Sequence, residues 1–154
     1  MKKRADAIVF LLAMALFLAG GAVRVERAPD AGEATVFAVA AAKYAKESYE
    51  STMEAAFRAL QNASLPGDER AACGACRDTY YAQARSSTVA AMNLLAECSF
   101  GQLGGEYAAA ADAIKACRDA QSKLRSPAIY GLAVSDLMVA ALASGLGELV
   151  IDKQ

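Results

Sequence analysis

The sequence predicts an all-α protein, an up-down-up-down bundle of four helices. Two observations favour this fold class. Alanine has the highest helix propensity and supplies 38 of the 154 residues, whereas proline occurs only 3 times and glycine 11 times. Apolar residues also recur at three- and four-residue intervals over four long stretches, the period of helices that bury one face. The length fits one domain.

The first 22 residues predict a signal peptide. Basic residues at positions 2–4 precede an apolar run over 7–19, and small residues at 20–22 suit cleavage. The run is short for a membrane span, which needs about 20 residues. We therefore expect a secreted, extracellular protein that has no stable membrane insertion after cleavage. Residues 23–34 are expected to be an irregular leader, and residues 35–152 to form the helical domain.

The first helix is predicted over residues 35–62. Its apolar positions repeat at helical spacing, and charged residues fall on the opposite side. The inward positions are Ala42, Ala45, Tyr49, Met53, Ala56, Phe57 and Leu60. The charged positions, interpreted as a solvated face, are Lys43, Glu47, Glu50, Glu54 and Arg58.

The second helix is predicted over residues 69–97, after a turn at 65–68 in which Asp68 serves as the N-cap. The glycines at 101, 104 and 105 are expected to separate it from the next helix. Its predicted buried stripe is Cys73, Cys76, Tyr80, Ala84, Ser87, Ala91 and Leu94.

The third helix is predicted over residues 106–123, with a buried stripe of Tyr107, Ala110, Ile114, Cys117, Gln121 and Leu124. Ser126-Pro127 predicts the start of the fourth helix, which continues to about residue 151. The predicted buried stripe of this helix is Tyr130, Val134, Leu137, Met138, Ala141, Leu142 and Leu149. Asp136 and Glu148 favour a core helix over a membrane span.

Composition excludes several classes of function. Histidine is absent, which removes the commonest general base and most catalytic zinc sites. The net charge of −1 argues against a nucleic-acid partner. Asp112 and Asp119 share a helix face, but a catalytic pair of carboxylates also needs a cleft. We therefore expect no enzyme, no catalytic residue and no cofactor.

Four cysteines lie beyond the predicted signal peptide, where secretion permits disulfides. Cys73 and Cys76 form a CxxC, but Cys98 and Cys117 do not supply the second CxxC of a structural zinc site. At least one disulfide is therefore expected, and no metal.

A family resemblance rests on the order of several motifs. Cys76-x-x-x-Tyr80-x-x-x-Ala84 comes first, then a glycine-rich turn before Glu106-Tyr107, then Cys117-x-Asp119 and Ser126-Pro127. Over residues 37–151 this pattern resembles the plant invertase and pectin methylesterase inhibitor family. The resemblance implies a secreted, non-enzymatic bundle with a disulfide between the second and third helices, here Cys76 to Cys117.

The remaining two cysteines have no counterpart in that family pattern. Cys73 and Cys98 are then expected to be free thiols, or Cys98 to bridge two chains. The protein is accordingly expected to be a monomer, with a dimer through Cys98 as the alternative.

The resemblance also implies a function, the occlusion of an active-site groove in a 1:1 complex with a cell-wall (apoplast) enzyme. Family members carry an extra N-terminal hairpin that this sequence lacks, so the chain is interpreted as a shortened or divergent member. The residues proposed for the partner interface are Asp78, Arg85, Glu106 and Asp112, which are expected to be exposed, and Tyr107, which adjoins Glu106.

The target is interpreted from residues 105–107. Invertase inhibitors of the family tend to carry Pro-Lys-Phe where this chain has Gly105-Glu106-Tyr107, so the charge offered to the partner is reversed. Pectin methylesterase is therefore the favoured target. The alternatives are inhibition of acid invertase, or a secreted interaction protein without inhibitory activity.

Overall fold

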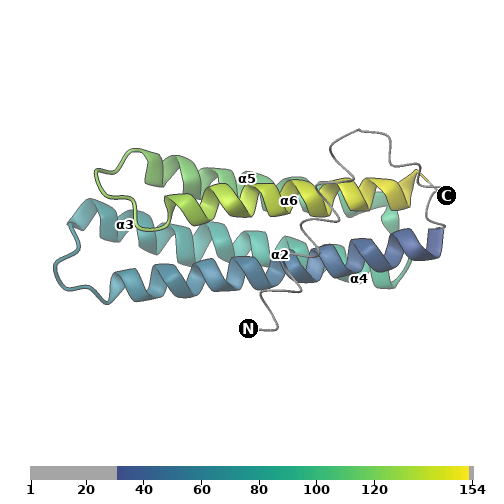
Figure 1. Ribbon diagram of the computed structural model, residues 1–154, viewed down its shortest axis with the longest axis horizontal. Coiled ribbons are helices and arrows are strands. Elements are labelled where there is room, and N and C mark those ends of the chain that lie inside the picture. The colour runs from purple at the N-terminus through teal and green to yellow at the C-terminus, as the bar shows by residue number, and fades with distance from the viewer. Residues whose placement is uncertain (1–30, 153–154) are drawn as a thin grey trace, which may run out of the picture.

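The computed structural model describes residues 31–152, which form one antiparallel bundle of long helices (Figure 1). The predicted signal peptide and most of the leader lie outside these residues. The elements are α2 (Ala31–Leu60), α3 (Gly67–Ala75), the π-helical turn η1 (Cys76–Tyr81), α4 (Ala82–Ala96), the short 3-10 turn η2 (Phe100–Gln102), α5 (Leu103–Ser122) and α6 (Tyr130–Ile151).

Four long rods make up the described part of the bundle, because α3, η1 and α4 run on as one continuous helix. The neighbouring pairs are α2 with α6, α6 with α5, α5 with α4, and α4 with α2. Consecutive helices are thus antiparallel neighbours, and the predicted up-down-up-down fold is confirmed.

Alanine dominates the contacts between the helices. Most buried positions of α2 are alanines, and the larger core side chains come mainly from the other elements. The largest fully buried apolar side chains are Tyr49, Tyr81, Leu95, Leu103, Ile114, Ile129 and Val150. Small side chains let helix axes approach closely, so a few large residues are enough to fill the space between the helices.

Several helix ends differ from the sequence prediction. Helix α2 begins at Ala31, so residues 31–34 are helical and not part of the irregular leader. Helix α3 begins at Gly67 after Pro66, and Asp68 is not its N-cap: the Asp68 carboxylate accepts a hydrogen bond only from the adjacent Glu69 amide. A glycine can occupy the first turn of a helix, where the amides lack intrahelical partners in any case.

The loop between α5 and α6 is longer than the sequence predicts. Helix α6 begins at Tyr130, three residues after Pro127. Residues 123–129 connect α5 to α6, and Ile129, the last of them, is buried in the core. Gly104 and Gly105, expected to separate the second and third helices, lie in the first turn of α5.

A single π turn changes the register of the second long helix. The sequence placed Tyr80, Ser87 and Leu94 in the core, but the buried residues after Cys76 are Tyr81, Ala84, Thr88, Ala91 and Leu95. Across the wide turn η1, the next buried position, Tyr81, comes five residues after Cys76, whereas in an α-helix it comes three or four residues later. Three predicted core positions therefore moved by one residue.

Helix α6 turns a different face inward from the one predicted. Its buried residues are Ala133, Asp136, Ala140, Ala143, Gly147 and Val150, whereas Tyr130, Val134 and Met138 are exposed, Met138 by 72%. Helix α6 carries apolar residues on every side, so their periodicity does not identify the buried face. By length and composition α6 could also cross a membrane, a test that a core helix passes as well.

The disulfide implied by the family resemblance is present. Cys76 is bonded to Cys117, with 5.0 Å between their Cα atoms and a sequence separation of 41. A loop of that size stabilises the fold by about 4 kcal/mol in the chain-entropy description. Cys73 and Cys98 are free, Cys73 in the core and Cys98 at the surface. Cys98 has a φ of 53°, in the left-handed region that favours glycine after a helix.

Candidate functional site

An open groove of about 570 Å³ runs between α2 and the helix formed by η1 and α4. Helix α2 contributes residues at positions 50, 53, 54 and 57, a spacing that puts all four on one helix face. The opposite wall comes from the π turn and the first turn of α4. The lining residues are Glu50, Met53, Glu54, Phe57, Arg77, Asp78 and Arg85.

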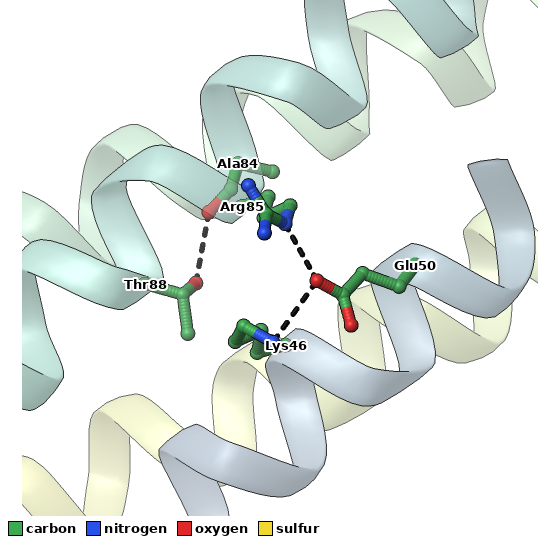
Figure 2. A network of polar contacts seen from close by, with 5 residues as sticks. All are labelled: Lys46, Glu50, Ala84, Arg85 and Thr88. Atoms are coloured by element: carbon green, nitrogen blue, oxygen red, sulfur yellow. Dashed lines mark hydrogen bonds and ion pairs between the residues drawn. The ribbon is translucent and has the colours of Figure 1, made fainter.

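A three-residue ion-pair network closes one part of the groove. The Glu50 carboxylate accepts a hydrogen bond from Arg85 Nε at 2.6 Å and lies 3.0 Å from Lys46 Nζ. Figure 2 shows Glu50 on α2 held between these two cations, with Arg85 reaching across from α4. Hydrogen bonding to Arg85, and then to Lys46, lowers the pKa of Glu50 below its ordinary value. The network links two helices.

The π turn supplies the other charged pair. Arg77 donates two hydrogen bonds to the Asp78 carboxylate, at 2.6 and 2.7 Å. The same guanidinium lies over the Phe57 ring, 5.7 Å from its centroid. Hydrogen bonding from Arg77 lowers the pKa of Asp78 below its ordinary value. Arg77 thus bridges the apolar and the acidic parts of the groove.

The groove combines an apolar floor with fixed charges. Phe57 is 43% exposed, and Met53 is half-buried beside it. Arginine and aromatic residues carry much of the binding energy in protein interfaces. The groove lining holds no Ser, Cys or His that could act as a nucleophile. Within residues 31–152, moreover, no three His, Cys, Asp or Glu side chains are placed to hold a metal ion. This geometry suits the binding of another protein.

The structure separates the five residues predicted for the partner interface. Asp78 and Arg85 line the groove together, 7 residues apart on one helix. The half-buried Glu106 and the exposed Asp112 lie on α5, which is not among the lining elements. Tyr107 is only 3% exposed and belongs to the core, so its assignment to a surface was wrong. Burial raises the pKa of Tyr107 to about 12.

Tyr107 is buried because α6 approaches it closely. A Cβ atom added at Gly147 would lie 2.5 Å from Tyr107 Cε2, so the ring occupies the space that the glycine leaves. The aromatic residue beside Glu106 thus packs against α6. Of these two neighbouring residues, only the half-buried Glu106 reaches the surface.

Sequence reasoning missed five groove residues, of which Arg77 received no assignment and the other four lie on α2. Glu50 and Glu54 were assigned to a solvated face, and Met53 and Phe57 to the buried stripe of the same helix. The boundary between those two faces is where α4 approaches α2, so one edge of each lines the groove. Nothing in the pattern of α2 alone indicates which boundary the neighbouring helix would leave open.

A second polar cluster is buried in the core. The Asp136 carboxylate of α6 accepts hydrogen bonds from Ser48 and Thr52 of α2, at 2.5 and 2.6 Å, and from the Tyr81 hydroxyl at 2.7 Å. Asp136 is 1% exposed, so a partner cannot reach it. Burial, and then the Asp136 charge, raise the pKa of Tyr81 above its ordinary value. The cluster ties three elements together without forming a binding site.

Comparison with known proteins gives a likeness of fold and no match of sequence families. No protein-family model and no curated protein matches the sequence. Among solved structures, the chain is similar to the crystal structure of a pectin methylesterase inhibitor from Arabidopsis thaliana, with a TM-score of 0.55 and 19% identity. The likeness covers 71% of this chain and 78% of that one. At that identity the two proteins share the helical fold.

Proposed function

We propose that the protein is a secreted inhibitor of pectin methylesterase, which it blocks in a 1:1 complex by covering the active-site groove of the enzyme. The observation that carries this proposal is the likeness of the bundle to a solved pectin methylesterase inhibitor. The motif order from Cys76 to Pro127 and the Cys76–Cys117 disulfide agree with it. Inhibition of this kind needs no chemistry, only a complementary surface of roughly 800 Å² on each partner.

The groove between α2 and α4 is the proposed centre of that surface. The Glu50 carboxylate is held by Arg85 across the two helices and by Lys46 within α2, so little conformational entropy is lost when a partner binds. Arg85 and Phe57 are the expected anchors, because each is exposed and belongs to a residue type that dominates interface energies. Asp78 and Glu54 add negative charge beside them.

The direct test is a titration of the oxidised protein into plant pectin methylesterase and, in parallel, into acid invertase. We expect loss of methylesterase activity at one equivalent, a 1:1 complex by size-exclusion chromatography, and unchanged invertase activity. Inhibition of invertase alone would assign the protein to the alternative target. Inhibition of neither enzyme would favour an interaction protein without inhibitory activity.

Variants then locate the contact surface. Arg85→Ala and Phe57→Ala should each weaken inhibition by about tenfold or more, the usual effect of truncating an interface anchor. Asp112→Ala tests the competing surface on α5, and Lys115→Ala is the matched control, an exposed charge on that same helix. A loss of inhibition with Asp112→Ala and none with Arg85→Ala would move the interface from the groove to α5.

A further inference from the structure

A free thiol lies beside the disulfide in the core. Cys73, Cys76, Cys117 and Gln121 are all fully buried where the second long helix meets α5. Gln121 Nε2 is 3.7 Å from Cys73 Sγ and 3.9 Å from Cys76 Sγ. The thiol and the disulfide therefore share one amide group between them.

The amide of Gln121 is itself unusual. Its Oε1 atom is buried without a hydrogen-bond partner, a costly arrangement in a packed core. Each half of the amide can form a hydrogen bond with a different protonation state of a neighbouring sulfur. The N–H group can stabilise a thiolate, and the oxygen can accept the hydrogen of a thiol. The Gln121 amide therefore offers a polar partner to either state of a neighbouring sulfur.

We propose that Cys73 exchanges with the Cys76–Cys117 disulfide, so that the protein has two disulfide isomers. The Cys73 thiolate attacks Sγ of Cys117, the bond between Cys117 and Cys76 breaks, and a Cys73–Cys117 bond forms. Cys76 leaves as a thiolate and takes up the proton that Cys73 released. One disulfide and one thiol are present before and after the step, so neither an oxidant nor a reductant is needed.

The helix geometry permits both isomers. Cys73 lies one turn before Cys76, displaced by about 4.5 Å along the helix axis. Combined with the 5.0 Å between the Cα atoms of Cys76 and Cys117, this puts Cys73 and Cys117 roughly 7 Å apart. Disulfides are found up to a Cα separation of about 6.8 Å, so a small movement of the helices completes the bond.

The exchange would also act on the groove. Cys76 is the first residue of the π turn, and the next two residues are the groove residues Arg77 and Asp78. In the second isomer the covalent link moves to Cys73, within α3, and the π turn loses its anchor to α5. We expect this isomer to hold Arg77 and Asp78 less firmly and to inhibit less well, a consequence that rests on the proposed function.

Disulfide mapping tests the exchange directly. The oxidised Cys98→Ser protein, which lacks the exposed thiol, is incubated at neutral and mildly alkaline pH, acidified, denatured and alkylated. Cleavage after Arg70 and Arg77 leaves Cys73 and Cys76 in one peptide, so fragment ions must show which of them carries the alkyl group. We expect label on both, and a faster approach to that mixture at the higher pH because the thiolate is the attacking species. Label on Cys73 alone at every pH would overturn the proposal.

Two variants sharpen the result. Cys76→Ser should form the Cys73–Cys117 disulfide, and a folded variant with both thiols free would contradict the proposal. If that variant does not fold, the labelling of the Cys98→Ser protein still decides. Gln121→Leu keeps the side-chain volume but removes the N–H donor, so it should slow exchange by about tenfold or more. An unchanged rate would mean that Gln121 only fills space, and the role proposed for its amide would fall.

Inhibition is measured separately, on Cys73→Ser and Cys76→Ser. The first variant is fixed in the Cys76–Cys117 form and the second in the Cys73–Cys117 form, and we expect the first to be the stronger inhibitor. If neither inhibits, the proposed function fails while the mapping still reports on the exchange. If both inhibit equally, the exchange does not regulate the groove.

Discussion

Two carboxylates of this protein make similar numbers of polar contacts in opposite environments. Glu50 lies in the groove between two cations, Lys46 and Arg85. Asp136 lies in the core among three hydroxyl groups, and none of the ion pairs within residues 31–152 includes it. Water competes for the contacts of Glu50, whereas Asp136 has only the protein to satisfy it.

The difference separates recognition from folding. The Glu50 network should contribute little to stability, because its ion pairs are exposed to water. The Asp136 cluster joins α2, η1 and α6, and in an apolar helix it is the feature that selects which face turns inward. A polar group that must be satisfied gives a register that uniform apolar packing does not.

The largest effect should come from removing the buried carboxylate. Asp136→Ala leaves three hydroxyl groups without their acceptor and creates a small cavity, which should lower the free energy of unfolding by roughly 3 kcal/mol. Denaturant unfolding followed by circular dichroism measures this value. A change below 1 kcal/mol would mean that the cluster contributes no more than a surface pair, and the comparison would fail.

The buried tyrosines should make the core sensitive to alkali. Burial, together with the nearby Asp136 charge, raises the pKa of Tyr49 and Tyr81, and burial alone raises that of Tyr107 to about 12. Their contribution to stability is complete below the unfolded pKa of about 10 and is lost as pH rises toward the folded values. The loss is about 1.4 kcal/mol per pH unit for each tyrosine.

Denaturant midpoints measured between pH 9 and pH 12 check this prediction. The ultraviolet absorbance of tyrosinate reports ionisation directly, and the buried Tyr49, Tyr81 and Tyr107 should ionise only above the ordinary tyrosine pKa. Ionisation of all tyrosines in a single step near pH 10, with the fold intact, would contradict it.

A smaller effect should follow from removing one donor to Asp136. Tyr81→Phe keeps the ring, its edge contact with Tyr49 and two of the three hydrogen bonds. We expect a loss of about 1 to 2 kcal/mol and a weaker dependence of stability on alkaline pH. Tyr80→Phe, at the neighbouring half-buried position, is the control and should change little. Equal losses would indicate that the π turn does not fix which tyrosine enters the core.

The smallest effect is expected in the groove. A double-mutant cycle with Glu50→Gln and Arg85→Met should give a coupling energy below about 1 kcal/mol that decreases further in salt. Because the folded pKa of Glu50 is lowered, its contribution is present above the unfolded value and disappears as pH falls through the folded one. A coupling as large as the Asp136 effect would show that the groove network also supports the fold.

The sequence predicted the number of helices, their order and the disulfide, because each depends on strong local signals or on a motif that spans the chain. The prediction failed where contacts with other helices determine the local structure. Nothing in residues 76–81 signals a π turn, so the stripe after Cys76 was one residue out at Tyr81 and Thr88. Helix α6 is apolar on every side, and its sequence does not show that Asp136 accepts hydrogen bonds from Ser48, Thr52 and Tyr81.

The candidate site was predicted in part, for the same reason. Asp78 and Arg85 were found as exposed positions of the second helix, and the groove contains both. Phe57 was expected in the core, because it follows Met53 at helical spacing. Its ring lies instead at the edge of the α2–α4 contact, beneath Arg77. The way α2 and α4 pack against each other therefore places Phe57 in the groove, and the pattern of α2 alone does not show this.

The π turn affects how this sequence should be aligned with related sequences. A turn with one extra residue is what a single-codon insertion leaves in a helix that must keep its packing on both sides. Removal of one residue from 77–80 would give a regular helix in which Cys76 and the present Tyr81 are one ordinary turn apart. A relative without the insertion would match this chain residue for residue only if the comparison allows a gap within the helix.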